Sequence, residues 1–545
     1  MLPPALKSPR EVVLYYDRVY YNLIDAGRAH PFLYPWATIG AAVVLGYLLI
    51  DHRQAPALRW CRYPVFGFLC VFQAWCTLTN RARNPAASLG VGLLSCWAVM
   101  WVGAIMLWND CQTDFRRIER SDETLNQQVT EPQSNGTLSN GNANPSEDVS
   151  ALRQRKPLST KTKTEDRSTK GPAQRGGRLF WQPYPAAPFI ERLEWVADVF
   201  CSFRGVGWSW QTSGIPPPPQ WVQAQLDGDA TAEERPEPVT VSRTGIRRYS
   251  DRALLVRHTI QNLVVGYFAL DVFVTLMHRD PYFWGYIDAP APSHLPALIR
   301  HSPILTKSYR LSLSLCGIYT ALWAIFKLGP LFFCAVLGPK WIGVRGEAWM
   351  NPADMYGSFS QVLDNGLAGW WGGWWHQTFR FAFEAPTTWL LARFRIEKRS
   401  PLGRGIGLVI AFFMSGCIHA CGSYTLLGDT RPLMGPMRFF LLQGVGILVQ
   451  ILTSMALSKA GVTQRMPKVV SQATNFVFVH VWLYYTAPLL TDDFARGGVW
   501  LFEPVALSPL RGLGFGAPDD RFFCWWNAPV SWRTGKRWWD TGLAL

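Results

Sequence analysis

The sequence predicts an all-α polytopic membrane protein with about eight transmembrane helices and additional re-entrant or interfacial helices. Apolar runs of roughly 20 residues, the length that crosses a bilayer core, recur along the 545-residue chain. The 27 Trp and 31 Phe fit the aromatic belts of membrane interfaces, although a large soluble core would also accommodate them. The mean hydropathy is near zero because one polar segment, 112–175, offsets the apolar runs.

Eight apolar runs are the predicted spans. The second run is short and the fifth contains Pro330, so each is also a candidate for a kinked or re-entrant segment. In chain order, the runs cover residues 31–50, 63–79, 87–108, 256–277, 311–337, 405–426, 437–458 and 470–490.

Basic residues between the spans predict the orientation of the chain. With eight spans, three basic clusters fall on one side of the membrane, which the positive-inside rule assigns to the cytosol. The N-terminus is then lumenal and the 109–255 connection cytosolic, so the sequon at Asn135 should remain unglycosylated. Arg81 and Arg83 run against this trend, because they fall in a lumenal turn. The clusters are Arg53, Arg59 and Arg62; Arg393, Arg395, Lys398, Arg399 and Arg404; and Lys459, Arg465 and Lys468.

The net charge of +15 does not indicate a nucleic-acid partner, because much of it lies in one polar segment. From Arg153 to Arg178 the chain carries nine Lys or Arg and two acidic residues, in a composition typical of disorder. We predict a disordered, solvated cytosolic linker over 109–178. Contact of this basic run with anionic lipid headgroups is the alternative interpretation.

The linker separates the other predicted parts of the chain. Residues 1–108 form the N-terminal transmembrane helices, and 256–490 form the main transmembrane core. Between them, 179–255 carries aromatic residues and a proline run and is predicted to be an ordered interfacial segment. Residues 491–545 are the predicted C-terminal tail.

His419 is the first candidate functional residue, because an ionisable group inside an apolar span is costly unless it has a use. Residues three and four positions away share its helical face, and all four are small. They would leave a cavity beside the imidazole, with hydroxyl groups to orient it. The alternative is a histidine that links two helices, for which small neighbours are also normal. These neighbours are Ser415, Gly416, Gly422 and Ser423.

His376 is the second candidate and lies in the stretch GWWGGWWHQTFRF, residues 369–381. Such a Gly/Trp segment is poorly suited to a straight helix, and irregular backbone at membrane depth is tolerated only in a protein interior or along a cavity. The alternative is an interfacial anchor at headgroup level. A second histidine within about 45 residues favours a shared site. Its neighbours Trp374, Trp375 and Gln377 are then predicted to contact substrate, together with Ser415, Gly416 and Ser423.

Other sites are not supported by the sequence. Cys417 and Cys421 flank His419 at positions two apart, which point to opposite sides of a helix, so a shared metal ion is not expected. Asn109, Asp110 and Asp114 depart by one residue from the metal-diphosphate motif of membrane prenyltransferases. We find no GxSxG elbow, soluble-acyltransferase HxxxD, P-loop or GxGxxG motif.

Several motifs resemble the wax-synthase-like branch of the membrane-bound O-acyltransferase superfamily. WWGGWWHQTFR is similar to the block FWG-x-x-WHQ-x-FR, and SGCIH, ending at His419, resembles the small-residue-rich helix that leads to the superfamily's histidine. FRGVGWSW (203–210) and LLTDDFARGGVWLFEPVALSPLRGLG (489–514) resemble fungal members that acetylate terpenoids and meroterpenoids. The resemblance covers roughly 180–520. Gly372 and Gly373 depart from it where many relatives carry a charge, and many superfamily members have Asn in place of His376.

The resemblance implies a bundle of the same type and acyl transfer from acyl-CoA to an alcohol. It implies acetyl-CoA as co-substrate, no permanently bound cofactor, and a terpenoid or meroterpenoid hydroxyl as acceptor. A neutral imidazole with a pKa near 6.5 can take a proton from an alcohol, so His419 is the expected general base. His376 would stabilise the oxyanion or orient substrate, and Arg380, Arg393 and Arg395 would bind the CoA phosphates or serve lipid headgroups.

Two alternatives to acetyl transfer remain at this point. One is a long-chain acyl-CoA:alcohol acyltransferase that makes wax or sterol esters, since the depth of the cavity sets the donor length. The other is a non-enzymatic polytopic transporter or scaffold. In each case membrane lipid is a partner, and for the enzyme we expect the endoplasmic reticulum as location.

Overall fold

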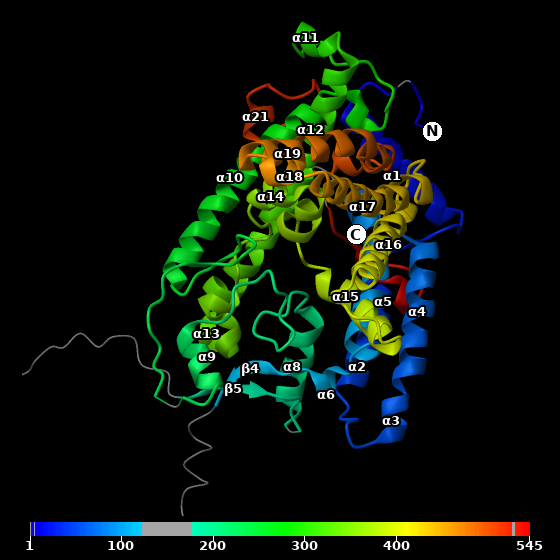
Figure 1. Ribbon diagram of the computed structural model, residues 1–545. Helices are drawn as coiled ribbons and strands as arrows, with labels where there is room; N and C mark the ends of the chain where they lie inside the picture. The colour runs from blue at the N-terminus through cyan, green and yellow to red at the C-terminus, as the bar shows by residue number, and fades with distance from the viewer. Residues whose placement is uncertain (1, 5, 122–176, 187, 230, 526–528) are drawn as a thin grey trace, which may run out of the picture.

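The computed structural model describes residues 2–4, 6–121, 177–186, 188–229, 231–525 and 529–545. The described chain is largely helical, with a few short strands (Figure 1), so the predicted all-α class is confirmed. Most of the predicted 109–178 linker, including Asn135, lies outside the described residues.

Five helical stretches in the described chain are long and apolar enough to cross a membrane. Each overlaps one of the predicted spans over nearly the whole length of that span, which supports a multi-pass membrane protein. They are α5 (Pro85–Met106), α10 (Arg252–His278), Pro303–Gly346 with α12 (Pro303–Pro330) at its start, α16 (Pro401–Thr425), and Leu433–Lys459, which joins η7 (Leu433–Met437) to α17 (Arg438–Lys459).

The remaining three predicted spans also contain helices, but the first is much shorter than expected. The helical part is Trp36–Leu48, because the apolar residues before it form strand β2 (Leu33–Tyr34), which pairs with β9 (Gly542–Ala544) near the C-terminus. The second and eighth predicted spans correspond to α4 (Arg62–Thr79) and to α19 (Lys468–Thr486) followed by α20 (Pro488–Arg496).

The helix that contains Pro330 does not break there. It passes directly into a π-helix, η3 (Leu331–Leu337), whose wider turns tolerate a missing backbone N–H. The kink or re-entrant turn considered for this run is therefore a local widening of one long helix.

Helices α5 and α16 pack against each other more extensively than any other pair of elements in the described chain. Ser88 Oγ donates a hydrogen bond to the carbonyl of Thr425 at 2.5 Å, and Thr425 Oγ1 donates to the carbonyl of Ser88 at 2.6 Å. Gly92 faces the backbone of Cys421, where an added Cβ would lie 1.9 Å from the carbonyl oxygen. Small residues and interhelical hydrogen bonds of this kind hold helices together where apolar burial gives little preference between protein and lipid.

Short elements cover one end of the bundle, at the bottom of Figure 1. Strands β4 (Arg117–Arg120) and β5 (Leu179–Gln182) pair antiparallel beside α8 (Phe189–Cys201) and α6 (Cys111–Asp114). The other elements of the N-terminal half are α1 (Pro9–Asp25), β1 (His30–Pro31), η1 (Trp36–Thr38), α2 (Ile39–Leu48), α3 (Pro56–Trp60), β3 (Asn80–Arg81), α9 (Gln220–Leu226), β6 (Thr240–Val241) and β7 (Arg247–Arg248).

The C-terminal half contains further short elements between its long helices. The predicted tail packs against the N-terminal helix, as the hydrogen bond from Tyr16 to the carbonyl of Arg496 at 2.8 Å illustrates. The elements are η2 (Pro281–Trp284), α11 (Ala297–Arg300), α13 (Gly338–Ile342), η4 (Gly343–Gly346), η5 (Ala348–Met350), α14 (Ser360–Gly369), η6 (Trp370–Trp374), α15 (Arg380–Arg393), α18 (Val462–Arg465), η8 (Val499–Leu501), α21 (Pro509–Gly512), β8 (Ser531–Arg533) and η9 (Trp538–Asp540).

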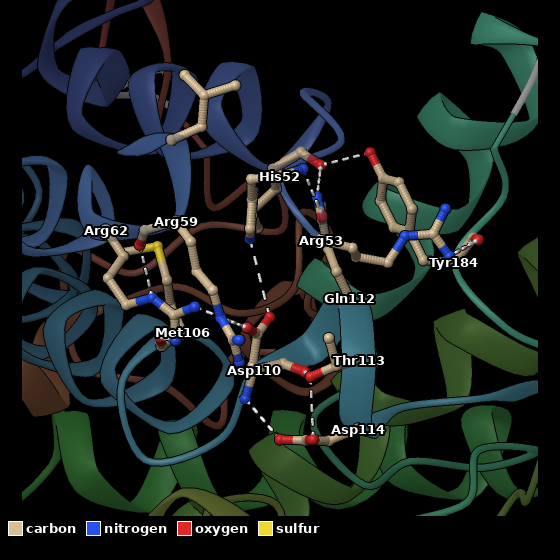
Figure 2. Close-up of polar contacts among 12 residues, drawn as sticks. His52, Arg53, Arg59, Arg62, Met106, Asp110, Gln112, Thr113, Asp114 and Tyr184 are labelled. Carbon is tan, nitrogen blue, oxygen red and sulfur yellow. Dashed lines mark hydrogen bonds and ion pairs between the residues drawn. The ribbon is translucent and has the colours of Figure 1, made fainter. Parts of the chain in front are cut away.

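A buried carboxylate joins α4 to the end of α5 (Figure 2). Asp110 accepts hydrogen bonds from Arg59 Nε at 2.9 Å and Arg62 Nη2 at 2.6 Å, and His52 Nε2 lies 3.8 Å from its other oxygen. Two arginines of the first predicted basic cluster are therefore engaged in internal ion pairs. The same contacts occupy the carboxylate considered above as a metal ligand, and Asp114 accepts the backbone N–H of Asp110 at 2.7 Å.

Candidate active site

The Gly/Trp segment forms an irregular wall, as its composition predicted. Gly366 interrupts α14 with a φ of +60°, a conformation that favours glycine. A Cβ at this position would lie 1.9 Å from Gln450 Nε2, and Gln450 Oε1 accepts the N–H of Leu367 at 2.8 Å. The chain then continues as the π-helix η6 and becomes extended at Trp375.

Aromatic stacking and backbone hydrogen bonds fix this wall. The rings of Trp370 and Trp374 lie 4.4 Å apart in an edge-to-face arrangement. Gln377 Nε2 donates to the carbonyls of Trp371 and Trp375 at 2.9 Å and 2.7 Å, which closes the turn between η6 and the following loop. The position of His376, directly between Trp375 and Gln377 in the chain, is set by these contacts.

A cavity of about 720 Å³ lies against this wall, and both His376 and His419 line it. Its lining is mainly apolar, with side chains from α12, η6, α15, α16, α17, α19 and α20. The two histidines that the sequence singled out thus face one chamber, although they come from different elements.

The hydrogen bond of His419 determines its tautomer. His419 Nδ1 lies 2.8 Å from the carbonyl oxygen of Ser415, and a carbonyl can only accept a hydrogen bond. In the neutral ring, Nδ1 therefore carries the proton and Nε2 carries the free lone pair. The ring of Phe440 packs at 4.3 Å between centroids and holds the imidazole in place.

His376 lies between aromatic rings and has an unsatisfied nitrogen. Its ring centroid is 5.5 Å from Trp375 and 5.4 Å from Phe379. Its Nδ1 is buried and has no hydrogen-bond partner within the described part of the chain. Buried polar atoms are rarely left unpaired without a functional or structural reason, so His376 has hydrogen-bonding capacity to offer to a ligand.

A third histidine, His480 of α19, also lines the cavity. It was not among the candidate residues predicted from the sequence. Its Nδ1 lies 2.8 Å from the carbonyl of Phe476, the same arrangement as in His419. The signal that could have found it is the rule applied to His419, since His480 is an ionisable residue within the predicted 470–490 span.

Three of the predicted substrate contacts line the cavity, namely Trp375, Gln377 and Ser415, and three do not. Trp374 packs behind the wall, stacked on Tyr319 at 5.7 Å. Gly416 lies against Met437 of η7, where a Cβ would be 2.5 Å from the sulfur.

Ser423 is the third predicted substrate contact that does not line the cavity. Its side chain is fully buried and donates a hydrogen bond to Asp493 Oδ2 at 2.6 Å. The face that Ser423 shares with His419 is thus divided between the cavity and helix packing, and Gly422 likewise contacts Leu89 of α5.

The basic rim of the cavity differs in part from the prediction. Arg380 lines the cavity, together with Lys398 and Arg404. Arg393 and Arg395 are exposed and lie outside the lining, because α15 ends at Arg393 and the chain turns away at Arg395 with a φ of +54°. From Arg404 to His419 is about 22 Å along α16 at 1.5 Å per residue.

Glu384 holds two of the rim cations. Arg380 Nε lies 2.8 Å and Lys398 Nζ 3.5 Å from its carboxylate oxygens. These side chains are partly exposed to solvent, where ion pairs are weak and can exchange for another anion. The rim can therefore accept negative charge at the entrance to an apolar chamber.

A second buried ion cluster supports the wall from behind. Asp354 binds Arg247 through both carboxylate oxygens at 2.8 Å, and the buried Lys327 Nζ lies 3.8 Å from it. Burial raises the pKa of the Asp354 carboxyl, but the hydrogen bonds and charge of Arg247 and the charge of Lys327 outweigh this, so its pKa lies below the ordinary 3.8. Three residues on, the N–H of Gly357 donates to the carbonyl of Trp374 at 2.9 Å.

The segment 203–210 contributes to the same support. Arg204 Nη1 donates to the carbonyl of Asp354 at 2.9 Å, so this segment is tied to the chain just before the Gly/Trp wall. As for metal binding, no group of three His, Cys, Asp or Glu side chains in the described ranges could hold an ion.

Comparison with known proteins shows that the region containing both histidines is similar to a known family. Residues 352–442 match the membrane bound O-acyl transferase family. O-Mevalon transferase macI of Penicillium terrestre is 26% identical over 271 residues, which cover 48% of this chain and 53% of the relative. O-Mevalon transferase yanI of Aspergillus niger is 26% identical over 274 residues, with the same two coverages.

Acetyltransferase eriL of Hericium erinaceus is 29% identical over 191 residues, which cover 33% of this chain and 46% of the relative. The chain thus spans about half the length of the curated relatives it matches. No solved structure matches. The resemblance indicated by the two histidine motifs is confirmed, and the chain is related to the membrane-bound O-acyltransferases and, within them, to fungal proteins named as acetyl and O-mevalon transferases.

Proposed function

We propose that this protein is a membrane-bound O-acyltransferase that transfers an acyl group from acyl-CoA to a hydroxyl of a hydrophobic acceptor. The observation that carries the proposal is the placement of His376 and His419 on one mainly apolar cavity in a region that matches an O-acyltransferase family. The proposed donor is acetyl-CoA and the proposed acceptor a terpenoid or meroterpenoid. Names of relatives support this choice, since several are acetyltransferases.

In the proposed reaction, His419 is the general base. Its Nδ1–H is engaged with the Ser415 carbonyl, which leaves Nε2 to accept the proton of the alcohol as the oxygen attacks the thioester carbon. The resulting imidazolium then returns the proton to the departing CoA thiolate when the tetrahedral intermediate collapses. Ser415 orients the ring through its carbonyl, in the manner of the third member of a hydrolase triad.

His376 is proposed to stabilise the negative charge on the thioester oxygen or to orient the acceptor. Its buried Nδ1, which has no hydrogen-bond partner among the described residues, supports a role toward a ligand, because an oxyanion forming in a water-poor site gains from any donor already in place. The mainly apolar lining has a second benefit, since excluding water limits hydrolysis of the thioester.

Coenzyme A is anionic, so its phosphates are proposed to remain at the basic rim while the pantetheine arm enters the cavity. Arg380, Lys398 and Arg404 line that rim and replace Arg393 and Arg395 in this role. The roughly 22 Å from Arg404 to His419 is a distance that an extended chain can cover. We place the protein in the endoplasmic reticulum membrane with this rim toward the cytosol.

The test is release of free thiol from acetyl-CoA by membranes that contain the protein, with and without hydrophobic alcohols. We expect thiol release that depends on the alcohol and yields the acetyl ester. A transporter or scaffold would release none, which would end the proposal. Donors of increasing chain length, assayed in parallel, separate an acetyltransferase from a wax or sterol acyltransferase.

A further inference from the structure

The third histidine of the cavity is not used in the reaction proposed above. His480 lies in α19, twelve residues after Lys468, or about 18 Å along the helix. It faces the cavity from a different wall than His419. An imidazole within an apolar helix is costly at membrane depth without a function, and the His480 side chain is exposed where it lines the cavity and has no acidic partner among the described residues.

The chemistry of His480 is that of a hydrogen-bond acceptor. Its Nδ1 donates to the carbonyl of Phe476 at 2.8 Å, so in the neutral ring the lone pair is on Nε2. No described residue bonds that nitrogen. The ring packs at a tilt on Phe476, with 3.9 Å between centroids, and edge-on to Trp370 at 6.4 Å, which restrains its orientation.

His480 and His419 line the same cavity but lie near different residues of the Gly/Trp wall. Trp370 contacts His480, while its neighbour Trp371 packs at 5.8 Å on Phe440, whose ring lies against His419. The two imidazoles therefore enter the same chamber from α16 and α19, and no ring contact joins them in the described part of the chain, so each can meet a different group of one ligand. Much of the lining between them is apolar, and an unpaired donor of a ligand would be costly there.

We propose that His480 is a specificity residue that accepts a hydrogen bond from a second donor on the acceptor, remote from the hydroxyl that is acylated. The acceptor class is then a bifunctional hydrophobic molecule, such as a diol or a hydroxylated polycycle with a second free hydroxyl. A simple fatty alcohol has no such group. This inference rests on the proposed function and refines it, because it separates an oxygenated metabolite from a wax-forming alcohol.

The experiment compares acceptors that differ only in the second hydroxyl. Membranes containing the full-length protein receive acetyl-CoA with octanediol, decanediol or dodecanediol, or with the primary alcohol of equal length. Thiol release gives kcat and KM for each. A symmetrical diol has two hydroxyls that can react, and this affects wild type and variants equally. We therefore divide the KM of the diol by the KM of the alcohol for each protein and compare this ratio between wild type and variant.

His480→Phe is the principal variant, because it keeps an aromatic ring for the contacts with Phe476 and Trp370 and removes the accepting nitrogen. For the diol of best-fitting length we expect its KM to rise about five-fold, the usual value of one hydrogen bond, with kcat and the KM of the simple alcohol unchanged. His480→Gln should restore part of the preference. His258→Phe is the matched control, since His258 lies in α10 bonded to Asn262 and does not line the cavity.

Each outcome decides the inference. A diol preference that persists in His480→Phe overturns it, as does equal KM for diol and alcohol in wild type. Loss of turnover with every acceptor in His480→Phe and His480→Gln, with the protein still assembled, would make His480 a catalytic base and also overturn it. Should His480→Phe fail to assemble, His480→Leu provides the same comparison. Absence of thiol release from wild type would instead refute the proposed function.

Discussion

At the scale of single residues, the hydrogen bond from His419 Nδ1 to the Ser415 carbonyl has the most direct consequence. It makes Nε2 the basic atom, so removing the ring should remove proton transfer while leaving the helix intact. We expect His419→Ala to lower kcat about 10²- to 10⁴-fold, the usual contribution of a general base. The measurement is thiol release at saturating acetyl-CoA, with thermal unfolding in detergent to verify the fold.

Cys417→Ala is the control for this experiment, because it changes a residue two positions away on the same helix that does not line the cavity. Its rate should stay near that of wild type. If His419→Ala kept near-normal activity, the assignment of the base would be wrong.

His376 gives a second prediction. Its buried Nδ1, unpaired within the part of the chain that the structure describes, indicates a hydrogen bond to a ligand, and the amide of Asn is a smaller group that can also hydrogen-bond. We expect His376→Ala to lose most activity, on the order of 10²-fold as for removal of one oxyanion donor, and His376→Asn to retain more. Equal rates for the two variants would reduce His376 to a packing residue.

Asp354 gives a prediction about pH. Its folded-state pKa is below the ordinary 3.8, so the charged form contributes stability that is complete above the ordinary pKa and is lost as the pH falls through the folded value. We expect the thermal unfolding temperature of the wild type in detergent to be constant near neutrality and to fall in acid below about pH 4.

Asp354→Asn should abolish this part of the acid dependence and lower stability at neutral pH. The loss should be about 3 kcal/mol, because Arg247 and Lys327 lose a buried counter-charge. An unchanged unfolding temperature at neutral pH would show that the ion cluster is not needed for the fold.

In the sequence, the free-energy cost of an ionisable residue at membrane depth was a better guide to the cavity than a shared helical face. His376 and His419 were predicted from the expense of an imidazole at membrane depth, and the same rule would have found His480. Gly416 and Ser423 were placed at the cavity because they share a face with His419, but that face also packs on η7 and binds Asp493. Tertiary packing decides which residues of a helical face meet the cavity and which meet a neighbouring helix. Helical periodicity in the sequence gives no information on this division.

At the scale of elements, the contact of α5 with α16 fixes the helix that carries His419. A Cβ at Gly92 would lie 1.9 Å from the carbonyl oxygen of Cys421 and 2.4 Å from its carbon, and backbone cannot move aside without separating the helices. We expect Gly92→Ala to destabilise the protein by roughly 1–3 kcal/mol or more and to lower activity through the displaced His419. Thermal unfolding and thiol release measure both effects.

Gly90→Ala is the matched control on the same helix. No atom of the described residues lies within 4 Å of a Cβ at Gly90, and Ala is the better helix former, so this variant should unfold at or slightly above the wild-type temperature. Similar losses in both variants would mean that the α5–α16 contact is not limiting.

The positions of the helices were largely predictable, and their irregularities only in part. Apolar length placed the five long helices, while the irregular form of the 369–381 segment followed from its glycines. The shortness of the first span was not predictable, because Leu33 and Tyr34 pair with residues more than 500 positions later. The π-helix after Pro330 was likewise not predictable, because packing against neighbouring helices determines whether a proline kinks a helix or widens its turns.

At the scale of the whole molecule, the chain brings distant segments to one chamber. Residues 203–210, through Arg204, support the carbonyl of Asp354, and Asp493, in the stretch 489–514, binds Ser423 of α16. The stretches that resemble acyltransferases outside the two histidine motifs thus brace the helix and the wall that carry those histidines. Their spatial role was invisible in the sequence, which showed only that they resemble relatives.

The last prediction concerns the predicted linker, whose residues 122–176 lie outside the described chain. The described residues on either side are joined directly, because Arg120 pairs with Leu179 across the β4–β5 ladder. Deleting residues 121–170 leaves eight residues, 171–178, to connect two strand ends that are already adjacent. Loop closure of that length costs little and a shorter loop costs less entropy than a longer one. We therefore expect unchanged thermal unfolding and unchanged thiol release.

Deleting 171–182 instead removes strand β5 and the backbone partners of β4, and should reduce the amount of assembled protein. Loss of assembled protein in the 121–170 deletion would show that the linker itself takes part in the fold.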